Sequence, residues 1–414
     1  MIAESLTLVY GRITLVGEAR PLKGDSALGF SERTRMQPAK RVLFYADTNV
    51  LSGHDVMSLA ASDAIREYFP AVEIIWLISA DNERMLQQLR QKRYIFSFLK
   101  STPRERLLKH PFEVLYSVLA NSSKVRRIAP DVVVVAQGVV TLSFLGSIAM
   151  RLAGVAHCCY LPMGALASEC DSRGDSRLLD RLWRFSYRHT PNFIAIDAEQ
   201  KRLIAVSNPR ADIKIVENYV PRTSISSCER HEARREWQIL DSRLVIGVVG
   251  RVRFDQKNQD WLVRQLSANA FWKRFLVLFV GDGPDLPQLR QMVRALNLEG
   301  QVRMIGWTDR VHALYPALDL LLIPSRAEGV PLVMLEALAN GVPVAGSNRD
   351  GMKEWLPPEW RFEVGDGEGM KRAVLAATQQ DHEEFWRTTA AHLDLIHDRK
   401  RFATGFLEAI LSFI

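Results

Sequence analysis

Two glutamates, Glu328 and Glu336, stand eight residues apart, between a segment that predicts a buried strand and one that predicts a helix. The apolar run 318–323 is typical of a strand inside a parallel sheet. Pro331 suits the first turn of a helix, because its fixed φ is helical and its missing N–H is not needed there. Glu328 is therefore expected in the strand-to-helix loop and Glu336 inside the helix. Carboxylates in these places can accept hydrogen bonds from hydroxyl groups of a ligand.

The spacing of the glutamates indicates the size of that ligand. At a helical rise, the gap spans about 12 Å, which lets one carboxylate contact a sugar and the other the ribose of the same nucleotide-sugar. Gly329 allows close approach of the backbone, and N–H groups at the helix start, beside Val330, form a site for a phosphate. The alternative is that both glutamates are ordinary solvated charges on a helix.

Two cations, Arg251 and Lys257, follow a second strand-like run that begins at Val245. Breaking a sugar–phosphate bond leaves negative charge on a nucleoside diphosphate, and positioned cations stabilise that charge. Both residues are therefore candidates for catalysis. The alternative is that they are plain surface charges after a strand.

A resemblance separates these alternatives. Four segments, in order, resemble the C-terminal half of the glycosyltransferases of family 4, the retaining group 1 glycosyltransferases with a GT-B fold. They are the Gly-Arg…Lys segment 245–257, the strand and Gly-Asp-Gly-Pro turn 276–284, the strand and turn 302–307, and the segment 324–343 with its continuation to 354.

The resemblance implies an α/β protein of two Rossmann-like, doubly wound domains that face a central cleft. It also implies transfer of a sugar from a UDP- or GDP-sugar with retention of configuration. The catalytic residues would be Arg251 and Lys257, which hold the pyrophosphate, and Glu328, which orients the hydroxyls of the donor sugar. Glu336 would bind the ribose. Gly306 would line the base pocket.

The chain departs from the family pattern in three places. The first loop often carries a Gly-Gly pair in the family, whereas residues 47–54 contain only Gly53, the remaining candidate for phosphate contact. A histidine is common after a middle strand, where this chain has Tyr-Leu-Pro-Met-Gly at 160–164. His54 is expected to be a packing or loop residue. Asp350 stands where the family has the first glycine of a second Gly-Gly pair.

The N-terminal half alternates predicted strands and helices, which indicates a parallel sheet covered on both faces, with ligands at the carboxyl ends of the strands. The predicted strands are 41–46, 73–79, 131–136, 156–161, 192–197 and 212–216. The expected divisions are an N-terminal extension at 1–39, an acceptor domain at 40–221, a donor domain at 222–382 that begins with a linker at 222–232, and C-terminal helices at 383–414 that cross back to the first domain.

Composition agrees with a two-domain enzyme. The chain has 414 residues, 47% of them hydrophobic, which is enough for two cores. Four cysteines without Cys-x-x-Cys spacing, and no secretory signal, predict a cytoplasmic protein. The sequence contains no Asp-x-Asp motif, so we expect neither a metal nor a cofactor. The uncharged run 132–150 is long enough to cross a bilayer, but Gln137 and Gly138 interrupt it as in a strand, turn and helix.

Part of the net charge of +7 is concentrated between Arg84 and Lys109, where eight cations accompany a single acid, Glu105. With aromatic residues among them, these cations predict contact with an anionic membrane surface, which would bring the enzyme to a lipid-linked acceptor. The alternative is a solvated helix face or loop around one apolar strand at 94–99. No recognition motif accompanies the charge, so a nucleic-acid partner is not expected.

The expected function is therefore a retaining glycosyltransferase of the cytoplasm or of the inner face of the cytoplasmic membrane. Its acceptor would be a glycan or a lipid-linked sugar, in the assembly of bacterial surface polysaccharide or lipopolysaccharide. One alternative is a nucleotide-sugar epimerase of the same fold, which should bring histidines and carboxylates together. Another is a non-catalytic sugar-nucleotide-binding partner of a transferase, which would be free to lose the set formed by Arg251, Lys257, Glu328 and Glu336.

Overall fold

The computed structural model describes residues 41–100, 110–140, 144–164, 176–221, 227–239, 243–379 and 383–414. The predicted extension at 1–39, the start of the predicted linker and three cations of the basic stretch, Arg104, Arg106 and Lys109, lie outside the described residues.

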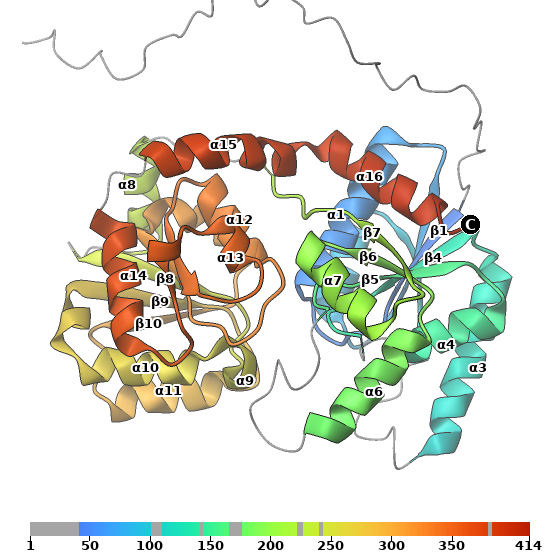
Figure 1. The fold of residues 1–414 in the computed structure, drawn as a ribbon, viewed down its shortest axis with the longest axis horizontal. Helices are drawn as coiled ribbons and strands as arrows, with labels where there is room; N and C mark the ends of the chain where they lie inside the picture. The colour runs from blue at the N-terminus through green and yellow to red at the C-terminus, as the bar shows by residue number, and fades with distance from the viewer. Residues whose placement is uncertain are drawn as a thin grey trace, which may run out of the picture. The chain divides into compact units, whose positions relative to one another are not determined.

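The N-terminal half contains a parallel sheet of seven strands in the order β3-β2-β1-β4-β5-β6-β7 (Figure 1). The strands are β1 (Arg41–Ala46), β2 (Glu73–Ile78), β3 (Ile95–Phe98), β4 (Val132–Ala136), β5 (His157–Tyr160), β6 (Asn192–Ala195) and β7 (Asp212–Ile215). All six predicted strands are confirmed to within about two residues, and β3 is the apolar strand expected inside the basic stretch.

Helices cover both faces of this sheet. They are α1 (Gly53–Tyr68), α2 (Glu83–Gln91), α3 (Pro111–Ile128), α4 (Phe144–Ala153), α6 (Ser176–Arg188) and α7 (Ala198–Ser207). Alternate residues of β1 point to opposite faces: Phe44 packs in one core cluster with residues of α1, and Leu43 in a second cluster with residues of α3 and α4. Among the described residues, no helix combines the length and apolar composition needed to cross a membrane.

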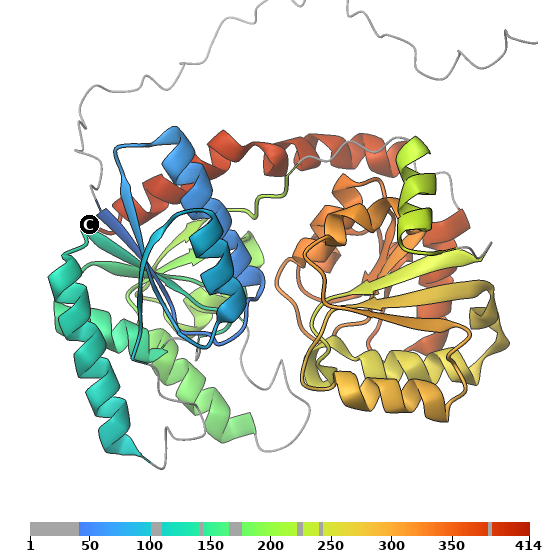
Figure 2. The ribbon, with the colours of Figure 1, turned by 180° about the vertical axis from the view of Figure 1, so that it is seen from behind.

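The C-terminal half repeats this plan with six parallel strands in the order β10-β9-β8-β11-β12-β13. The strands are β8 (Leu244–Val249), β9 (Phe275–Val280), β10 (Val302–Gly306), β11 (Leu320–Ile323), β12 (Val344–Ser347) and β13 (Arg361–Phe362). The helices are α9 (Phe254–Lys257), α10 (Gln259–Ala268), α11 (Leu286–Ala295), α12 (Leu332–Ala339), α13 (Met352–Trp355) and α14 (Gly367–Gln379), with short 3-10 turns η2 (Ala270–Arg274), η3 (Val311–Ala313), η4 (Tyr315–Ala317) and η5 (Pro358–Trp360). Figure 2 shows α10 and α11, in yellow, along one face of this sheet. The predicted architecture of two doubly wound α/β domains is confirmed.

Residues 227–232, predicted as linker, instead begin helix α8 (Ser227–Glu236). Two arginines of α8 bind one carboxylate just before β11: Arg230 donates to Asp319 at 2.5 Å and Arg234 at 2.7 Å. Asp319 also accepts a hydrogen bond from the Val245 N–H at 2.7 Å. Arg230, which lies in the predicted linker, and Arg234 thus fasten α8 to the start of the C-terminal sheet.

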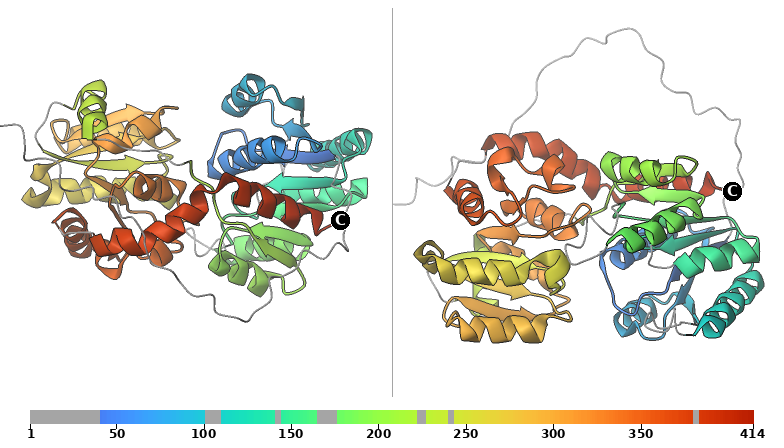
Figure 3. Two further views of the ribbon diagram at one scale, coloured as in Figure 1. Left: turned by 90° about the horizontal axis from the view of Figure 1, so that it is seen from above. Right: turned by 60° about the horizontal axis from the view of Figure 1, so that its bottom comes forward.

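The last two helices, α15 (Glu383–His397) and α16 (Arg399–Leu411), follow one another at the C-terminal end, in red in Figure 3. The Val220 N–H donates to the carbonyl oxygen of Ile396 at 3.0 Å, just before α16. The Phe406 ring of α16 packs against Phe44 and Tyr160, with centroids 6.3 and 5.8 Å away. The C-terminal helix therefore completes the core of the N-terminal sheet.

In each sheet the strand order reverses beside the first strand, between β1 and β4 and between β8 and β11. Ligands of doubly wound sheets bind outside the carboxyl ends of the strands at such a switch point. The loops after β8 and β11, which contain Arg251, Lys257 and Glu328, flank the switch point of the C-terminal sheet.

Glycines allow the loops after β8, β9 and β10 to lie in direct backbone contact. The Val252 N–H donates to the Asp282 carbonyl oxygen at 2.8 Å, and the Gly281 N–H to the Gly306 carbonyl oxygen at 2.7 Å. Gly281 has φ of 136°, and a Cβ there would lie 2.0 Å from the carbonyl oxygen of Gly250. The close approach of the two backbones therefore requires glycine at position 281, in the Gly-Asp-Gly-Pro turn.

Gly281→Ala should lower the free energy of unfolding by about 2–4 kcal/mol, because alanine disfavours this φ and its methyl group has no space. Gly300→Ala is the matched control, since a Cβ at Gly300 meets nothing within 4 Å, and it should change stability by less than about 1 kcal/mol. Urea unfolding of both variants measures the difference. Equal stability of the two variants would contradict this account of the turn.

Candidate active site

Lys257 and Glu328, both predicted as catalytic residues, form an ion pair. Lys257 Nζ lies 2.5 Å from Glu328 Oε1, and the two side chains are only 20% and 7% exposed. Lys257 ends α9, and the next residue, Asn258, adopts φ of 58° and donates its side-chain amide to the Pro324 carbonyl oxygen at 3.1 Å. This buried amide joins the loop after β8 to the end of β11, which directs Lys257 toward Glu328.

Asp350, which follows Glu328 in the chain, holds the backbone of Glu328 in place. The Glu328 N–H donates to Asp350 Oδ2 at 2.7 Å. Asp350 has φ of 46°, a left-handed conformation that Asp tolerates better than most residues. Burial raises the pKa of Asp350 to about 6, and the charge of Glu328 adds to the increase. The residue that departed from the family pattern thus fills a glycine-like backbone position and orients the loop of Glu328.

Gly329 and Val330 contact the N-terminal half. A Cβ at Gly329 would lie 2.2 Å from the carbonyl oxygen of Pro162, after β5. The carbonyl oxygen of Val330 accepts a hydrogen bond from the side-chain amide of Asn218 at 3.4 Å, and Asn218 in turn accepts one from the Tyr160 hydroxyl at 3.0 Å. Gly329 was predicted to allow close approach of a ligand. The approach that the structure records is to backbone, at the segment that replaces the family's histidine.

Glu336 lies on α12 and is held by a residue that sequence reasoning missed. The hydroxyl of Tyr315 donates to Glu336 Oε2 at 2.5 Å. Tyr315 is fully buried, and burial together with the charge of Glu336 raises its pKa well above the ordinary 10. The phenol therefore stays protonated and remains a donor. A tyrosine within an apolar stretch gave no signal of this role.

Arg251 lies in the loop after β8 and is exposed to solvent. Its carbonyl oxygen accepts a hydrogen bond from the side-chain amide of Gln259 at 2.9 Å. Desolvation and the neighbouring Arg253 lower the pKa of its guanidinium, while the charge of Asp282 opposes that change. Arginine remains protonated at neutral pH even so, and Arg251 supplies a second cation in the loop that contains Lys257.

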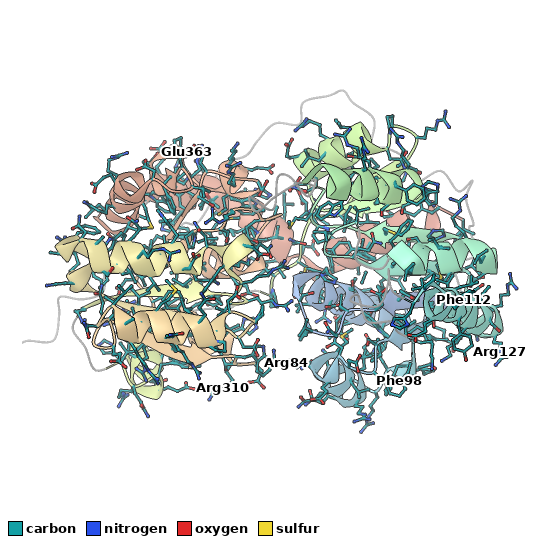
Figure 4. All side chains as sticks on the ribbon, turned by 90° about the horizontal axis from the view of Figure 1, so that it is seen from below. Arg84, Phe98, Phe112, Arg127, Arg310 and Glu363 are labelled. Atoms are coloured by element: carbon teal, nitrogen blue, oxygen red, sulfur yellow. The ribbon has the colours of Figure 1, made fainter. Side chains whose placement is uncertain are left out.

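An arginine from the N-terminal half reaches two of the family-like segments. Arg84 of α2, labelled in Figure 4, donates to both carboxylate oxygens of Asp282, at 2.5 and 3.3 Å. Its guanidinium also lies 4.1 Å from the ring centroid of Trp307, next to Gly306. The sequence placed Arg84 in a basic surface stretch. The structure places it against the predicted base-binding segment.

Gly53 opens α1 at the carboxyl end of β1, and a Cβ there would lie 3.5 Å from the Leu332 side chain at the start of α12. The next residue, His54, is 6% exposed, and its Nδ1 lies 2.9 Å from the Ser52 hydroxyl. That hydroxyl also donates to Asp55 at 2.9 Å. His54 is thus a packed residue in the hydrogen-bonded start of α1, as predicted.

At the C-terminal switch point these residues combine two cations, a buried carboxylate and the first turn of α12. Such a set can hold a diphosphate and receive the negative charge that forms when a sugar leaves it. Within the described ranges, no group of three or more histidine, cysteine, aspartate or glutamate side chains is placed to hold a metal ion.

Comparison with known proteins finds similarity to glycosyltransferases. Residues 243–383 match the family model of glycosyl transferases group 1. The chain is 30% identical to the N-acetyl-alpha-D-glucosaminyl L-malate synthase of Bacillus anthracis over 39% of the chain and 43% of that relative. It is 29% identical to the 2-deoxystreptamine N-acetyl-D-glucosaminyltransferase of Streptomyces fradiae over 67% of the chain and 69% of that relative. The matched part thus spans less than half of the first relative and about two thirds of the second.

Solved structures show the same fold. Anabaena HepE in complex with UDP-glucose superposes with a TM-score of 0.70, at 18% identity, over 90% of this chain and 100% of that one. WaaG, a glycosyltransferase involved in lipopolysaccharide biosynthesis, superposes with a TM-score of 0.63, at 15% identity, over 89% and 99% of the two chains. At these identities the likeness concerns the fold alone.

The raised pKa of Asp350 predicts a specific dependence of stability on pH. In the unfolded chain this carboxyl loses its proton near 3.8, whereas in the folded chain it keeps the proton until about pH 6. Its contribution to stability is therefore full below about pH 4 and is lost as the pH rises through 6. Asp350→Asn removes the titration and suits the same backbone conformation, so its melting temperature relative to wild type should rise between pH 4 and 6.

Calorimetry of wild type, Asp350→Asn and Asp309→Asn across this range tests the prediction. Asp309 is exposed, and its variant should follow wild type in parallel. A constant difference between Asp350→Asn and wild type from pH 4 to 7 would show that Asp350 does not titrate in this way.

Proposed function

We propose that the chain is a group 1 glycosyltransferase that transfers a sugar from a UDP- or GDP-sugar to a glycan or lipid-linked acceptor, with retention of configuration. The match of residues 243–383 to the family model and the GT-B fold support this proposal. The observation that carries this proposal is the buried pair of Lys257 and Glu328, 2.5 Å apart, at the switch point of the C-terminal sheet. It brings a phosphate-binding cation and a hydroxyl-binding carboxylate to one point.

The pair suits the charge that develops during transfer. As the bond between the sugar and the diphosphate breaks, its electron pair goes to the phosphate oxygen. Lys257 and Arg251 would stabilise that oxygen, helped by N–H groups at the start of α12. Glu328 would accept hydrogen bonds from the donor sugar. The acceptor hydroxyl would attack from the face that the diphosphate leaves and pass its proton to the departing oxygen, so no protein nucleophile is required.

The nucleoside would extend from this point toward β10. Tyr315 occupies one oxygen of the Glu336 carboxylate, which leaves the other to accept hydrogen bonds from the ribose hydroxyls. Gly306 and Trp307 would border the base, with Arg84 packed on the Trp307 ring. Because Arg84 comes from the N-terminal half, the base-binding segment and the first domain would be coupled.

Names of relatives support a role in a bacterial cell envelope. A galactosyltransferase of Escherichia coli that is 28% identical over 50% of this chain is named for a GlcNAc-diphosphoundecaprenol acceptor. A second Escherichia coli relative, 27% identical over 34% of the chain, is an O-antigen biosynthesis glycosyltransferase. These names support the proposal that the reaction belongs to the assembly of surface polysaccharide or lipopolysaccharide, and we propose that it takes place in the cytoplasm or at the inner face of the cytoplasmic membrane.

An epimerase of this fold would need acid–base groups around the sugar ring. His157 lies at the amino end of β5, the edge of the sheet opposite to the ligand-binding one. His54 is hydrogen-bonded to Ser52. Neither is placed with Glu328, so the transferase is the better-supported function.

Charge-neutral variants of the ion pair separate catalysis from folding. Lys257→Met and Glu328→Gln should each lower turnover by about 10²–10³-fold, the usual cost of losing one group that stabilises developing charge, and Lys257→Met should also destabilise the fold by leaving a buried carboxylate unpaired. The double variant restores neutrality, so it should recover stability but not turnover. Release of nucleoside diphosphate and thermal unfolding are measured together. A double variant with wild-type turnover would show that the pair is only structural.

A further inference from the structure

Helix α3 presents its large apolar side chains to solvent. Phe112, Leu115, Tyr116 and Leu119 are 85%, 53%, 61% and 51% exposed. Their positions, three, four and seven residues after Phe112, place all four on one face of the helix. We call these four residues the α3 stripe.

The opposite face of α3 is buried. Val118 and Val125 pack there in the core cluster of Leu43, and polar side chains beside them fix the orientation of the stripe through specific contacts. The Asn121 side chain accepts a hydrogen bond from the Lys100 N–H at 2.9 Å and donates to the Lys100 carbonyl oxygen at 3.1 Å. Ser117 and Ser122 are also buried, on the side that faces the sheet. In addition to its buried valines, α3 thus carries four large apolar side chains on the solvent-exposed face, where an amphipathic surface helix is usually polar. Exposed apolar patches of this kind mark interaction surfaces.

Cations surround the α3 stripe. Lys100 Nζ lies 5.7 Å from the centroid of the Tyr116 ring. Further along the same face of α3, Arg126 and Arg127 are exposed, and Figure 4 shows Arg127 and Phe112 at the surface. The acidic residue of α3, Glu113, has its Oε1 3.6 Å from His110 Nδ1. The stripe is therefore an apolar surface with a positive border.

Two of the described cations at the start of the basic stretch, Arg84 and Lys92, have other partners. Arg84 is paired with Asp282, and Lys92 with Asp63 at 2.6 Å. These two ion pairs leave less charge for a membrane at α2 than the sequence indicated, whereas α3 combines exposed apolar groups with exposed cations.

We propose that the α3 stripe binds an anionic lipid surface, with its apolar side chains in the interface and Lys100, Arg126 and Arg127 at the headgroups. Partition of this kind combines buried apolar area with attraction to anionic lipid. A second copy of the chain fits less well, because a symmetric pair would set the same cations against each other. The proposal does not depend on the sugar that is transferred.

Co-sedimentation of the full-length protein with vesicles tests the proposal. Wild type should bind vesicles of phosphatidylcholine and phosphatidylglycerol at least tenfold more strongly than vesicles of phosphatidylcholine alone, and 1 M salt should weaken that binding. The double variant Leu115→Glu with Leu119→Glu should lose at least tenfold of the binding while keeping its melting temperature, since both side chains are exposed. Arg127→Glu should weaken binding to the anionic vesicles only.

Val206→Glu is the matched control, because Val206 is 71% exposed on α7, and it should bind vesicles as wild type does. Equal binding by wild type and the double variant would overturn the proposal, as would wild type that ignores anionic vesicles. A wild-type dimer that the double variant dissociates, without vesicle binding, would assign the stripe to a second copy instead.

Discussion

The buried ion pair between Lys257 and Glu328 is the interaction on which the site depends. A carboxylate that is 7% exposed is costly unless a cation and hydrogen bonds compensate it. Lys257 supplies the cation from the loop after β8, and Asn258 fixes that loop to the end of β11. Asp350 supplies the hydrogen-bond acceptor for the Glu328 backbone. The segments that follow β8, β11 and β12 are therefore joined through Glu328, whose charge is part of the proposed catalytic pair.

The N-terminal half limits how these loops can move. Pro162 leaves no room for a side chain at Gly329, and Asn218 binds the carbonyl oxygen of Val330. Arg84 reaches Asp282 with both N–H groups of its fork. Contacts of this kind link the donor loops to the first sheet. A rearrangement of the first sheet would thus change the positions of the loops at the proposed donor site.

Much of the fold could be predicted because it is local in sequence. The apolar runs of parallel strands are distinctive, so the positions of six strands in the first half could be predicted to within about two residues. Glycines such as Gly281 signalled a turn, although the reason, a backbone contact with Gly250, is tertiary. The chemistry of Arg251, Lys257 and Glu328 was suggested by residue type and order together with the resemblance of four segments to a known family.

What could not be predicted depends on partners distant in the chain. Tyr315 meets Glu336 across a turn of apolar sequence, and Arg84 meets Asp282 from another sheet. The first part of α8 was predicted as a linker, because Arg230 and Arg234 meet their partner Asp319 only in the folded chain. The α3 stripe was hidden for the same reason: its periodicity is that of any buried helix face, and only the structure shows which side faces solvent.

The most direct test of the proposed donor site is a panel of UDP-, GDP-, ADP- and dTDP-sugars, without acceptor and with EDTA present. Binding and slow release of free nucleoside diphosphate are followed for each. The account predicts that one class of donor, with uracil or guanine as its base, is bound and slowly hydrolysed. Conversion of a donor to its epimer, or binding of none of them, would contradict it.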